Sequence, residues 1–244
     1  MIPKTLHYCW FGKKPLPPLA KKCIASWKTF FPDYEIIEWN ESNFDVNQIP
    51  YTAEAYKHKK YAFVSDYARF KILYEHGGLY FDTDVEVIKP MNDILKKGAF
   101  MGLEKDVQND FACNPGLGMA CVSQCSFFSI ILSLYNTLSF ENPDGSLNLK
   151  TVVEYTSNLM VQEGIELHEG VIDFMDFKIY PKDYFCPKAS EFDKIRITEN
   201  TRTIHHYAAS WISKKQRVAN FFIRIFGEKL ILKLWNFTQK KNKT

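Results

Sequence analysis

The sequence has no Cys-x-x-Cys pair, although it contains six cysteines among its 244 residues. No segment with the composition of a secretory signal peptide precedes its first apolar run. Zinc ribbons need closely paired cysteines, and disulfide frameworks are typical of exported chains. These absences argue against both classes and predict reduced, mostly buried thiols in a cytoplasmic protein.

Interdomain linkers rich in Gly, Ser or Pro are also absent, as are internal repeats and low-complexity tracts. A chain of this length without a linker can bury a core as one large domain. Aromatic residues are abundant, with 20 Phe and 13 Tyr, and such residues suit both a packed core and stacking surfaces for bases or sugars. We predict one domain over residues 1–213 and a tail over residues 214–244.

The chain has little net charge, only +3, but the charge is unevenly distributed. Residues 214–244 contain nine Lys or Arg and one Glu, which makes the tail +8 and the preceding body −5. A net acidic body argues against nucleic acid as a partner, whereas a basic tail favours an anionic one.

The tail has no uninterrupted apolar run of transmembrane length, because charges such as Arg224 and Lys233 divide it. Its apolar residues, including Phe221, Phe222 and Ile225, recur at helical spacing between the basic ones. Two interpretations remain open. A basic amphipathic helix could lie in an anionic membrane surface, peripherally on the inner face of the plasma membrane, or a helix could dock on the body.

The most informative stretch is SDYARFKILYEHGGLYFDTDVEVIKP. Its spacing predicts a helix over residues 64–76, buried on most of its surface and ended by a Gly-Gly pair that can adopt left-handed backbone. An apolar strand over residues 79–81 follows and leads into Asp82 and Asp84. Because side chains alternate along an extended segment, the two carboxylates lie on one face.

Two adjacent carboxylates repel, and a hard divalent cation with nucleotide phosphates is a common solution. Asp66 and Arg69 lie three positions apart on the predicted helix, so the two side chains could jointly bind the hydroxyls of a sugar. Each pair alone is a weak signal, since Asp-x-Asp occurs in many surface loops and Asp/Arg in many surface ion pairs. The ordered set favours a site for a cation and a sugar nucleotide.

Trp10 and Asn114 are two further candidates for contact with a ligand. Residues 5–11 read as a buried first strand with Trp10 near its end, where ligands gather in open α/β sheets. Trp10 could stack on a base or belong to the core. Asn114 begins the run NPGLG, whose glycines permit close approach to a ligand, although Asn before Pro is equally typical of a turn.

The central motif resembles the DXD signature of glycosyltransferase family 32, through Ser65, Asp66, Arg69, Leu73, Tyr74, Gly77, Gly78, Tyr80, Asp82 and Asp84. That family includes bacterial capsule and lipopolysaccharide sugar transferases and fungal Golgi mannosyltransferases. The clostridial glucosylating toxins are more distant relatives. The opening segment 2–12 resembles the first strand of the family, and the segment 205–211 resembles its closing motif.

The resemblance implies an α/β, GT-A-like fold, that is, a Rossmann-like mixed sheet flanked by helices, here followed by the basic amphipathic helix. It implies a metal-dependent, retaining glycosyltransferase that moves a hexose from a nucleotide diphosphate donor to a saccharide acceptor. UDP is the expected nucleotide. Bacterial capsule, lipopolysaccharide or other surface polysaccharide synthesis is the expected setting, and a lipid-linked acceptor would suit a tail at a membrane.

The resemblance also assigns roles to individual residues. Asp82 and Asp84 would hold Mn²⁺ or Mg²⁺ with one histidine, because adjacent residues on a strand point to opposite faces. Family position favours His206 over His205. The expected catalytic residues are Asp66, Arg69 and Asn114, and the expected nucleotide-sugar contacts are Trp10, Asp66, Arg69, Asp82, Ser210 and Trp211.

Two alternatives belong to other classes. A phosphatase of the haloacid dehalogenase type also places Asp-x-Asp after an apolar strand, but it normally has Thr or Val at the fourth position after the first Asp, where this chain has Glu86. A non-catalytic protein that binds sugar nucleotides or glycans would retain the pocket without turnover. The intact set of Asp66, Arg69, Asp82 and Asp84 favours the enzyme.

Overall fold

The structure is a computed structural model that describes residues 1–105, 111–188 and 194–208. The helices are α1 (Pro18–Phe30), α2 (Pro50–Lys57), α3 (Tyr61–His76), α4 (Asn92–Leu95), the 3-10 turn η1 (Pro115–Leu117), α5 (Ser126–Tyr135), α6 (Val152–Gln162) and α7 (Lys182–Phe185). The strands are β1 (Thr5–Cys9), β2 (Glu35–Trp39), β3 (Gly78–Tyr80), β4 (Val85–Val87), β5 (Ala99–Lys105), β6 (Ala112–Cys113), β7 (Met119–Cys121), β8 (Ile172–Phe174), β9 (Phe177–Tyr180) and β10 (Thr203–His205).

The centre of the fold is a mixed sheet with the strand order β2-β1-β3-β7-β5-β9-β8, to which β6 is added beside β5. β1 pairs in parallel with both β2 and β3, whereas β7 runs antiparallel to β3. The carboxyl ends of β1, β2 and β3 therefore meet at one edge of the sheet. Trp10, Asn40 and Asp82 follow these three strands, so the topology brings them to that common edge.

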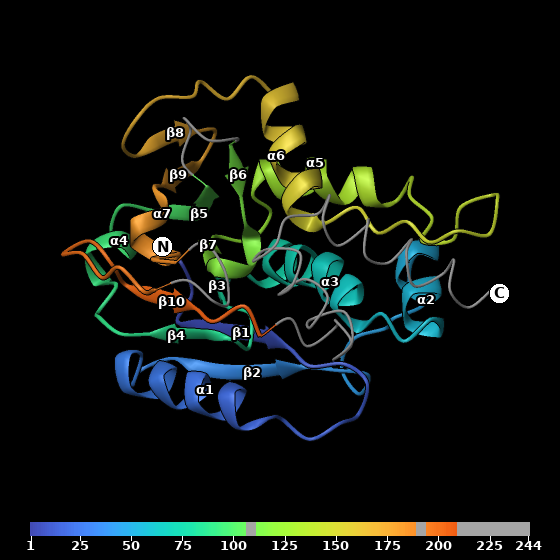
Figure 1. Cartoon of the computed structure of the whole chain (residues 1–244), viewed down its shortest axis with the longest axis horizontal. Helices are drawn as coiled ribbons and strands as arrows, with labels where there is room; N and C mark the ends of the chain where they lie inside the picture. Colours follow the sequence, from blue (N-terminus) through green and yellow to red (C-terminus); the bar gives the residue numbers. More distant parts are fainter. Residues whose placement is uncertain (106–110, 189–193, 209–244) are drawn as a thin grey trace, which may run out of the picture. The chain divides into compact units, whose positions relative to one another are not determined.

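Helices cover both faces of the sheet and enclose two apolar cores (Figure 1). One core lies under α2, α3, α5 and α6 and contains the inward-facing residues of α3, such as Val64 and Phe70. The other lies under α1, α4 and α7 and contains Trp27 and Phe81. This mixed sheet between helices confirms the α/β, GT-A-like fold expected from the sequence.

A second, two-stranded sheet joins β4 to β10 in antiparallel register, with His205 opposite Val85. This pairing is not predicted from the sequence. The Trp27 indole on α1 donates a hydrogen bond of 2.7 Å to the Val85 carbonyl, which fixes this small sheet against the first helix. As a result, the closing motif lies beside the DXD segment.

The Gly-Gly pair forms the junction that the sequence predicts between helix and strand. Gly77 has φ +64° and Gly78 has φ +101°, both in the region that disfavours side chains with a Cβ. A Cβ at Gly78 would also approach the Thr5 carbonyl oxygen of β1 to 2.6 Å. The turn therefore needs glycine for its backbone conformation and for its close contact with the neighbouring strand.

His7 on β1 is buried and is held as a neutral imidazole. The Trp39 indole donates to Nδ1 at 3.0 Å, so the proton is on Nε2, which faces the Gly77 carbonyl at 3.1 Å. Burial lowers the pKa of His7 to about 4, with nearby His76 acting in the same direction. An unfolded chain therefore binds a proton between about pH 6.5 and 4 that the folded chain excludes.

We expect the contribution of His7 to the free energy of unfolding to fall by about 3 kcal/mol as the pH is lowered from 6.5 towards 4. Urea unfolding at several pH values, compared between the wild type and His7→Gln, measures this contribution. The variant should lose part of the pH dependence even if it is less stable at every pH. Parallel curves for the two proteins would contradict the role of His7.

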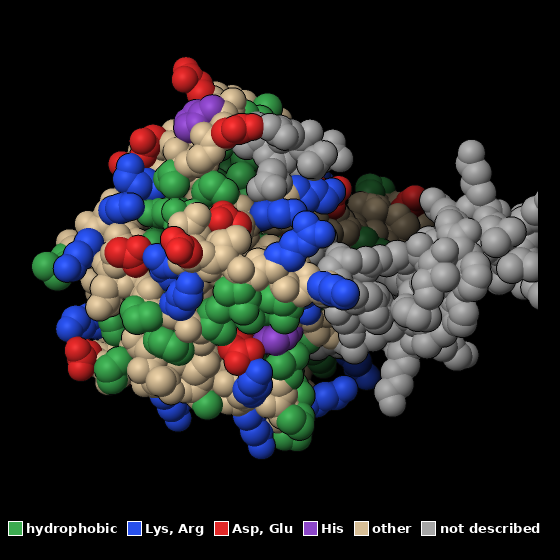
Figure 2. All heavy atoms as spheres, turned by 60° about the vertical axis from the view of Figure 1, so that its left-hand side comes forward, with side chains coloured by type: hydrophobic (Ala, Val, Ile, Leu, Met, Phe, Trp, Pro, Cys, Tyr) green, Lys and Arg blue, Asp and Glu red, His purple; other side chains and the backbone are tan. Residues whose placement is uncertain are grey.

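The cysteines and the surface agree with the composition. All six cysteines are free and buried, as the sequence predicts. Within the described part of the chain, no helix is long and apolar enough to cross a bilayer. Acidic and basic side chains are interspersed on the face shown in Figure 2. The predicted tail helix and the boundary at residue 213 lie outside the described residues, so both stay predictions.

Candidate functional site

Arg69 forms the centre of the candidate site. Its guanidinium Nη2 lies 2.9 Å from Asp66 Oδ1 and 3.0 Å from Asp82 Oδ1. Asp66 and Arg69 lie one turn apart on α3, as their spacing predicts, and Asp82 lies two residues after the end of β3. The side chain of Arg69 is only 4% exposed, so a single buried cation holds two carboxylates in place.

Burial disfavours the charged forms of the Asp66 and Asp82 carboxyl groups. Burial raises the pKa of Asp66 to about 7, in spite of the Arg69 charge that acts to lower it. Burial likewise raises the pKa of Asp82, against the effect of Arg69. The Tyr80 hydroxyl donates to Asp82 Oδ1 at 2.9 Å and supports its orientation. Near neutral pH, Asp66 can therefore exist with or without its proton.

Asp84 has the opposite character. Its Oδ2 accepts a hydrogen bond of 2.8 Å from the Ala208 amide and lies 3.4 Å from His205 Nε2. Burial acts to raise the pKa of Asp84, but His205 and the Ala208 amide outweigh it and hold the pKa at about 2. Burial would lower the pKa of His205, but the Asp84 charge raises it to about 10. This pair is therefore ionised at neutral pH.

The two histidines exchange the places expected from the sequence. His206 Nε2 lies 2.8 Å from Glu86 Oε2, which also pairs with Lys22 at 2.8 Å. His205 is the histidine beside Asp84, because successive residues of an extended segment face opposite sides and His206, directly after β10, lies beside Glu86. In this structure His205, not His206, therefore lies beside Asp84, and the assignment of His206 as a metal ligand stays a prediction.

Asn114 lies beside Asp82 through the turn that follows it. Its Oδ1 accepts from the Gly116 amide at 2.7 Å, and its Nδ2 donates to Glu104 Oε2 at 2.6 Å. The Gly116 carbonyl in turn accepts from the Asp82 amide at 3.2 Å. A Cβ at Gly116 would collide with Asp82 Oδ2, so this glycine permits close approach of the Asp82 carboxylate. From the sequence, the glycines of this run are expected to permit close approach of a ligand instead.

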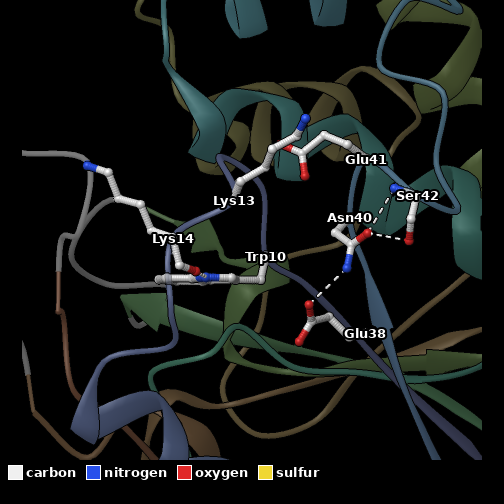
Figure 3. A pocket seen from close by; sticks show the side chains of 7 residues that line it. All are labelled: Trp10, Lys13, Lys14, Glu38, Asn40, Glu41 and Ser42. Carbon is white, nitrogen blue, oxygen red and sulfur yellow. Dashed lines mark hydrogen bonds between the residues drawn. The ribbon is translucent and has the colours of Figure 1, made fainter.

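Trp10 lines a pocket of about 480 Å³ at the carboxyl ends of β1 and β2. Figure 3 shows the flat indole ring below the side chains of Asn40, Glu41 and Ser42. The indole Nε1 donates to the Lys14 carbonyl at 2.6 Å, which fixes the plane of the ring. An aromatic face bordered by polar groups is suited to a nucleobase and its ribose.

The donor atoms at Asp82 and Asp84 fit a hard cation. Among the described residues, the hydrogen bonds and ion pairs of Asp82 involve Oδ1 and those of Asp84 involve Oδ2. Asp82 Oδ2 and Asp84 Oδ1 are therefore the candidate ligands. The described part of the chain holds no cluster of three or more protein ligands, and Mg²⁺ typically takes only one or two carboxylates with water and phosphate oxygens.

Several site features escape the sequence analysis. The contact of Tyr80 with Asp82 has a signal, since residues two apart on a strand share a face. Glu104 is visible only as an acid without a role, because its contact with Asn114 depends on the pairing of β5 with β6. Ser210 and Trp211, expected near the metal and the diphosphate, lie outside the described residues, and their roles stay predictions.

Comparison with known proteins agrees with the geometry. Residues 17–101 match the family described as the glycosyltransferase sugar-binding region containing DXD motif. An uncharacterised glycosyltransferase of Acanthamoeba polyphaga mimivirus is 34% identical over 110 residues, which cover 41% of this chain and 42% of that protein. Inositol phosphoceramide mannosyltransferase 1 of Schizosaccharomyces pombe is 27% identical over 111 residues, covering 41% and 33% of the two chains. The chain thus matches less than half the length of these relatives.

Among solved structures, PaToxG glycosyltransferase is similar in fold, with a TM-score of 0.50 and 20% identity over 67% of this chain and 70% of that one. The matched segment of the family contains Asp66, Arg69, Asp82 and Asp84. The resemblance seen in the sequence is therefore confirmed: residues 17–101 of this chain are similar to the DXD sugar-binding region of the glycosyltransferases.

Proposed function

We propose that this protein is a glycosyltransferase that moves a sugar from a nucleotide diphosphate donor to a saccharide acceptor. The observation that carries the proposal is the buried Arg69, which holds Asp66 and Asp82 together directly before Asp84. The Trp10 pocket opens at the same edge of the sheet. This combination provides a place for a base, for phosphates with a cation, and for sugar hydroxyls.

The residues of the chain have distinct tasks in this proposal. Trp10 stacks on the base, with UDP as the proposed nucleotide. Asp82 and Asp84 hold Mn²⁺ or Mg²⁺, which neutralises charge on the departing diphosphate. Arg69 and Asp66 bind hydroxyls of the donor sugar, and Asn114 lies beside them through the Gly116 turn. Arg69 also acts to lower the pKa of Asp82, against the larger effect of burial.

Retention of anomeric configuration is part of the proposal and rests on the family resemblance. The Asp66 and Asp82 oxygens that contact Arg69 are engaged in a buried ion pair, so we assign neither residue as a nucleophile. Bacterial surface polysaccharide, capsule or lipopolysaccharide synthesis is the proposed setting. The names of the curated relatives, which include mannosyltransferases, make a mannosyl donor worth testing beside UDP-sugars.

The decisive experiment is hydrolysis of a panel of UDP- and GDP-sugars by the purified full chain with Mn²⁺, with a chelator as the control. We expect metal-dependent release of one nucleotide. Trp10→Ala should weaken binding of that nucleotide by about tenfold or more, because base stacking contributes about 1–3 kcal/mol. Trp10→Phe should retain most of the affinity, since it keeps an aromatic face.

The alternatives predict other results. Calorimetric binding of a sugar nucleotide without turnover, even with saccharide acceptors present, would indicate the non-catalytic binding protein. Release of inorganic phosphate from simple phosphate esters would indicate the phosphatase. Absence of both binding and turnover across the panel would overturn the proposed function.

A further inference from the structure

Glu104 is a part-buried carboxylate at the site to which the family resemblance assigns no role. It lies near the end of β5, and its Oε2 accepts the Asn114 amide hydrogen at 2.6 Å. Such a short contact to a charged acceptor is among the stronger hydrogen bonds in proteins. The part of the chain that the structure describes provides no hydrogen bond to Glu104 Oε1.

The orientation of the Asn114 amide is fully determined by its neighbours. Oδ1 accepts from the Gly116 amide at 2.7 Å, which leaves Nδ2 to donate one hydrogen to Glu104. An amide nitrogen has two hydrogens. Among the described residues, the second N–H of Asn114 and the second oxygen of Glu104 therefore remain without a hydrogen-bond partner. They form a neighbouring donor and acceptor.

The surroundings place this pair at the donor side of the site. Gly116 connects Asn114 to the Asp82 backbone and packs against the Asp82 carboxylate. Burial, then Cys186 and then the Glu104 charge raise the pKa of Tyr207. The Tyr207 ring lies 4.2 Å from the His205 ring, centroid to centroid. Glu104 is thus linked to the Asp82 carboxylate through Asn114 and Gly116.

We propose that Glu104 and Asn114 form a hydroxyl-binding pair that recognises two neighbouring hydroxyls of the donor sugar. The free Glu104 oxygen accepts a hydrogen bond from one hydroxyl, and the free Asn114 N–H donates to the other. Adjacent hydroxyls present one donor and one acceptor at matching separation, so a carboxylate beside an amide complements a diol. Glu104 then determines which sugar is accepted, while Trp10 stacks on the base of the nucleotide. This inference rests on the proposed glycosyltransferase function.

Glu104→Gln and Glu104→Ala separate the two parts of this role. Glutamine can still accept from Asn114 but replaces the charged oxygen that faces the sugar, whereas alanine also releases Asn114. We expect KM for the nucleotide sugar identified by the donor panel to rise about tenfold in Glu104→Gln and about a hundredfold in Glu104→Ala. The Kd of the corresponding nucleotide diphosphate should stay within about twofold, because it lacks the sugar.

Glu163→Gln is the matched control, since Glu163 is an exposed carboxylate at the end of α6. Its kinetic constants should equal those of the wild type, and thermal unfolding should show that each variant is folded. An unchanged KM for hydrolysis in both Glu104 variants would overturn the inference while leaving the proposed function intact. Equal losses of sugar-nucleotide and nucleotide affinity would also overturn it. A wild type without binding or turnover would remove the proposed function and this inference with it.

Discussion

Replacement of Arg69 by methionine is expected to lower the free energy of unfolding by about 3–5 kcal/mol. The reason is that Arg69 is the buried cation between Asp66 and Asp82, and its loss leaves two buried carboxylates in mutual repulsion. Methionine retains much of the apolar volume of the side chain, so most of the loss reflects charge. Urea unfolding at pH 8 measures the effect.

The sign of the pH dependence provides a further check. Without Arg69, both carboxylates should take up protons more readily, so the destabilisation should be smaller at pH 5 than at pH 8. Adding Asp66→Asn to Arg69→Met removes one of the two opposed charges and should restore part of the stability at pH 8. A double variant as unstable as Arg69→Met, or a loss independent of pH, would contradict this account of the ion-pair cluster.

Asp84→Asn is expected to reduce metal-dependent turnover on the order of a thousandfold. The carboxylate proposed to hold the cation would lose its charge, and charge stabilisation by a metal ion contributes several kcal/mol to such reactions. The amide remains similar in size and can still accept the hydrogen bond of the Ala208 amide. Turnover at saturating Mn²⁺, together with the Mn²⁺ concentration required for half activity, measures the loss.

Glu86→Gln is the matched control for Asp84→Asn. Glu86 lies two residues further along the same segment and also pairs with a histidine, but it contacts His206 and Lys22 rather than the site. We expect Glu86→Gln to retain activity within a few-fold. Equal losses in the two variants would mean that both act through the β4–β10 sheet, and full activity in Asp84→Asn would remove Asp84 from the cation site.

Local patterns in the sequence predict the core of the site well. Asp66 and Arg69 share a helical face, as a period of 3.6 predicts, and Asp82 follows a buried strand as expected. Asp82 and Asp84 lie in a turn after β3, where the period of two does not apply. The Gly-Gly junction is also local, because its backbone conformation depends on residues next to it. The position of Trp10 at the edge of the sheet is also predictable, because Trp10 follows the first strand and ligands gather beyond the carboxyl ends of strands in open α/β sheets.

Features that depend on contacts distant in sequence are not predictable in this way. The choice between His205 and His206 depends on which face of β10 meets β4, and a shift of one residue in register would reverse it. The contact of Glu104 with Asn114 and the approach of Asp82 to Gly116 depend on how β5, β6 and η1 pack. The periodicity of residues within one helix or strand contains no information about which elements pack against each other.

The pairing of β4 with β10 positions Asp84 beside the segment that follows β10. The number of residues that connect the two strands does not affect this contact. Asp84 and Ala208 are 124 positions apart and yet share a hydrogen bond of 2.8 Å. Each doubling of a flexible loop costs only about 0.6 kcal/mol in closure entropy. Insertions or deletions on the surface between these strands are therefore thermodynamically inexpensive, so the segment between β4 and β10 can diverge in size while their pairing keeps His205 beside Asp84.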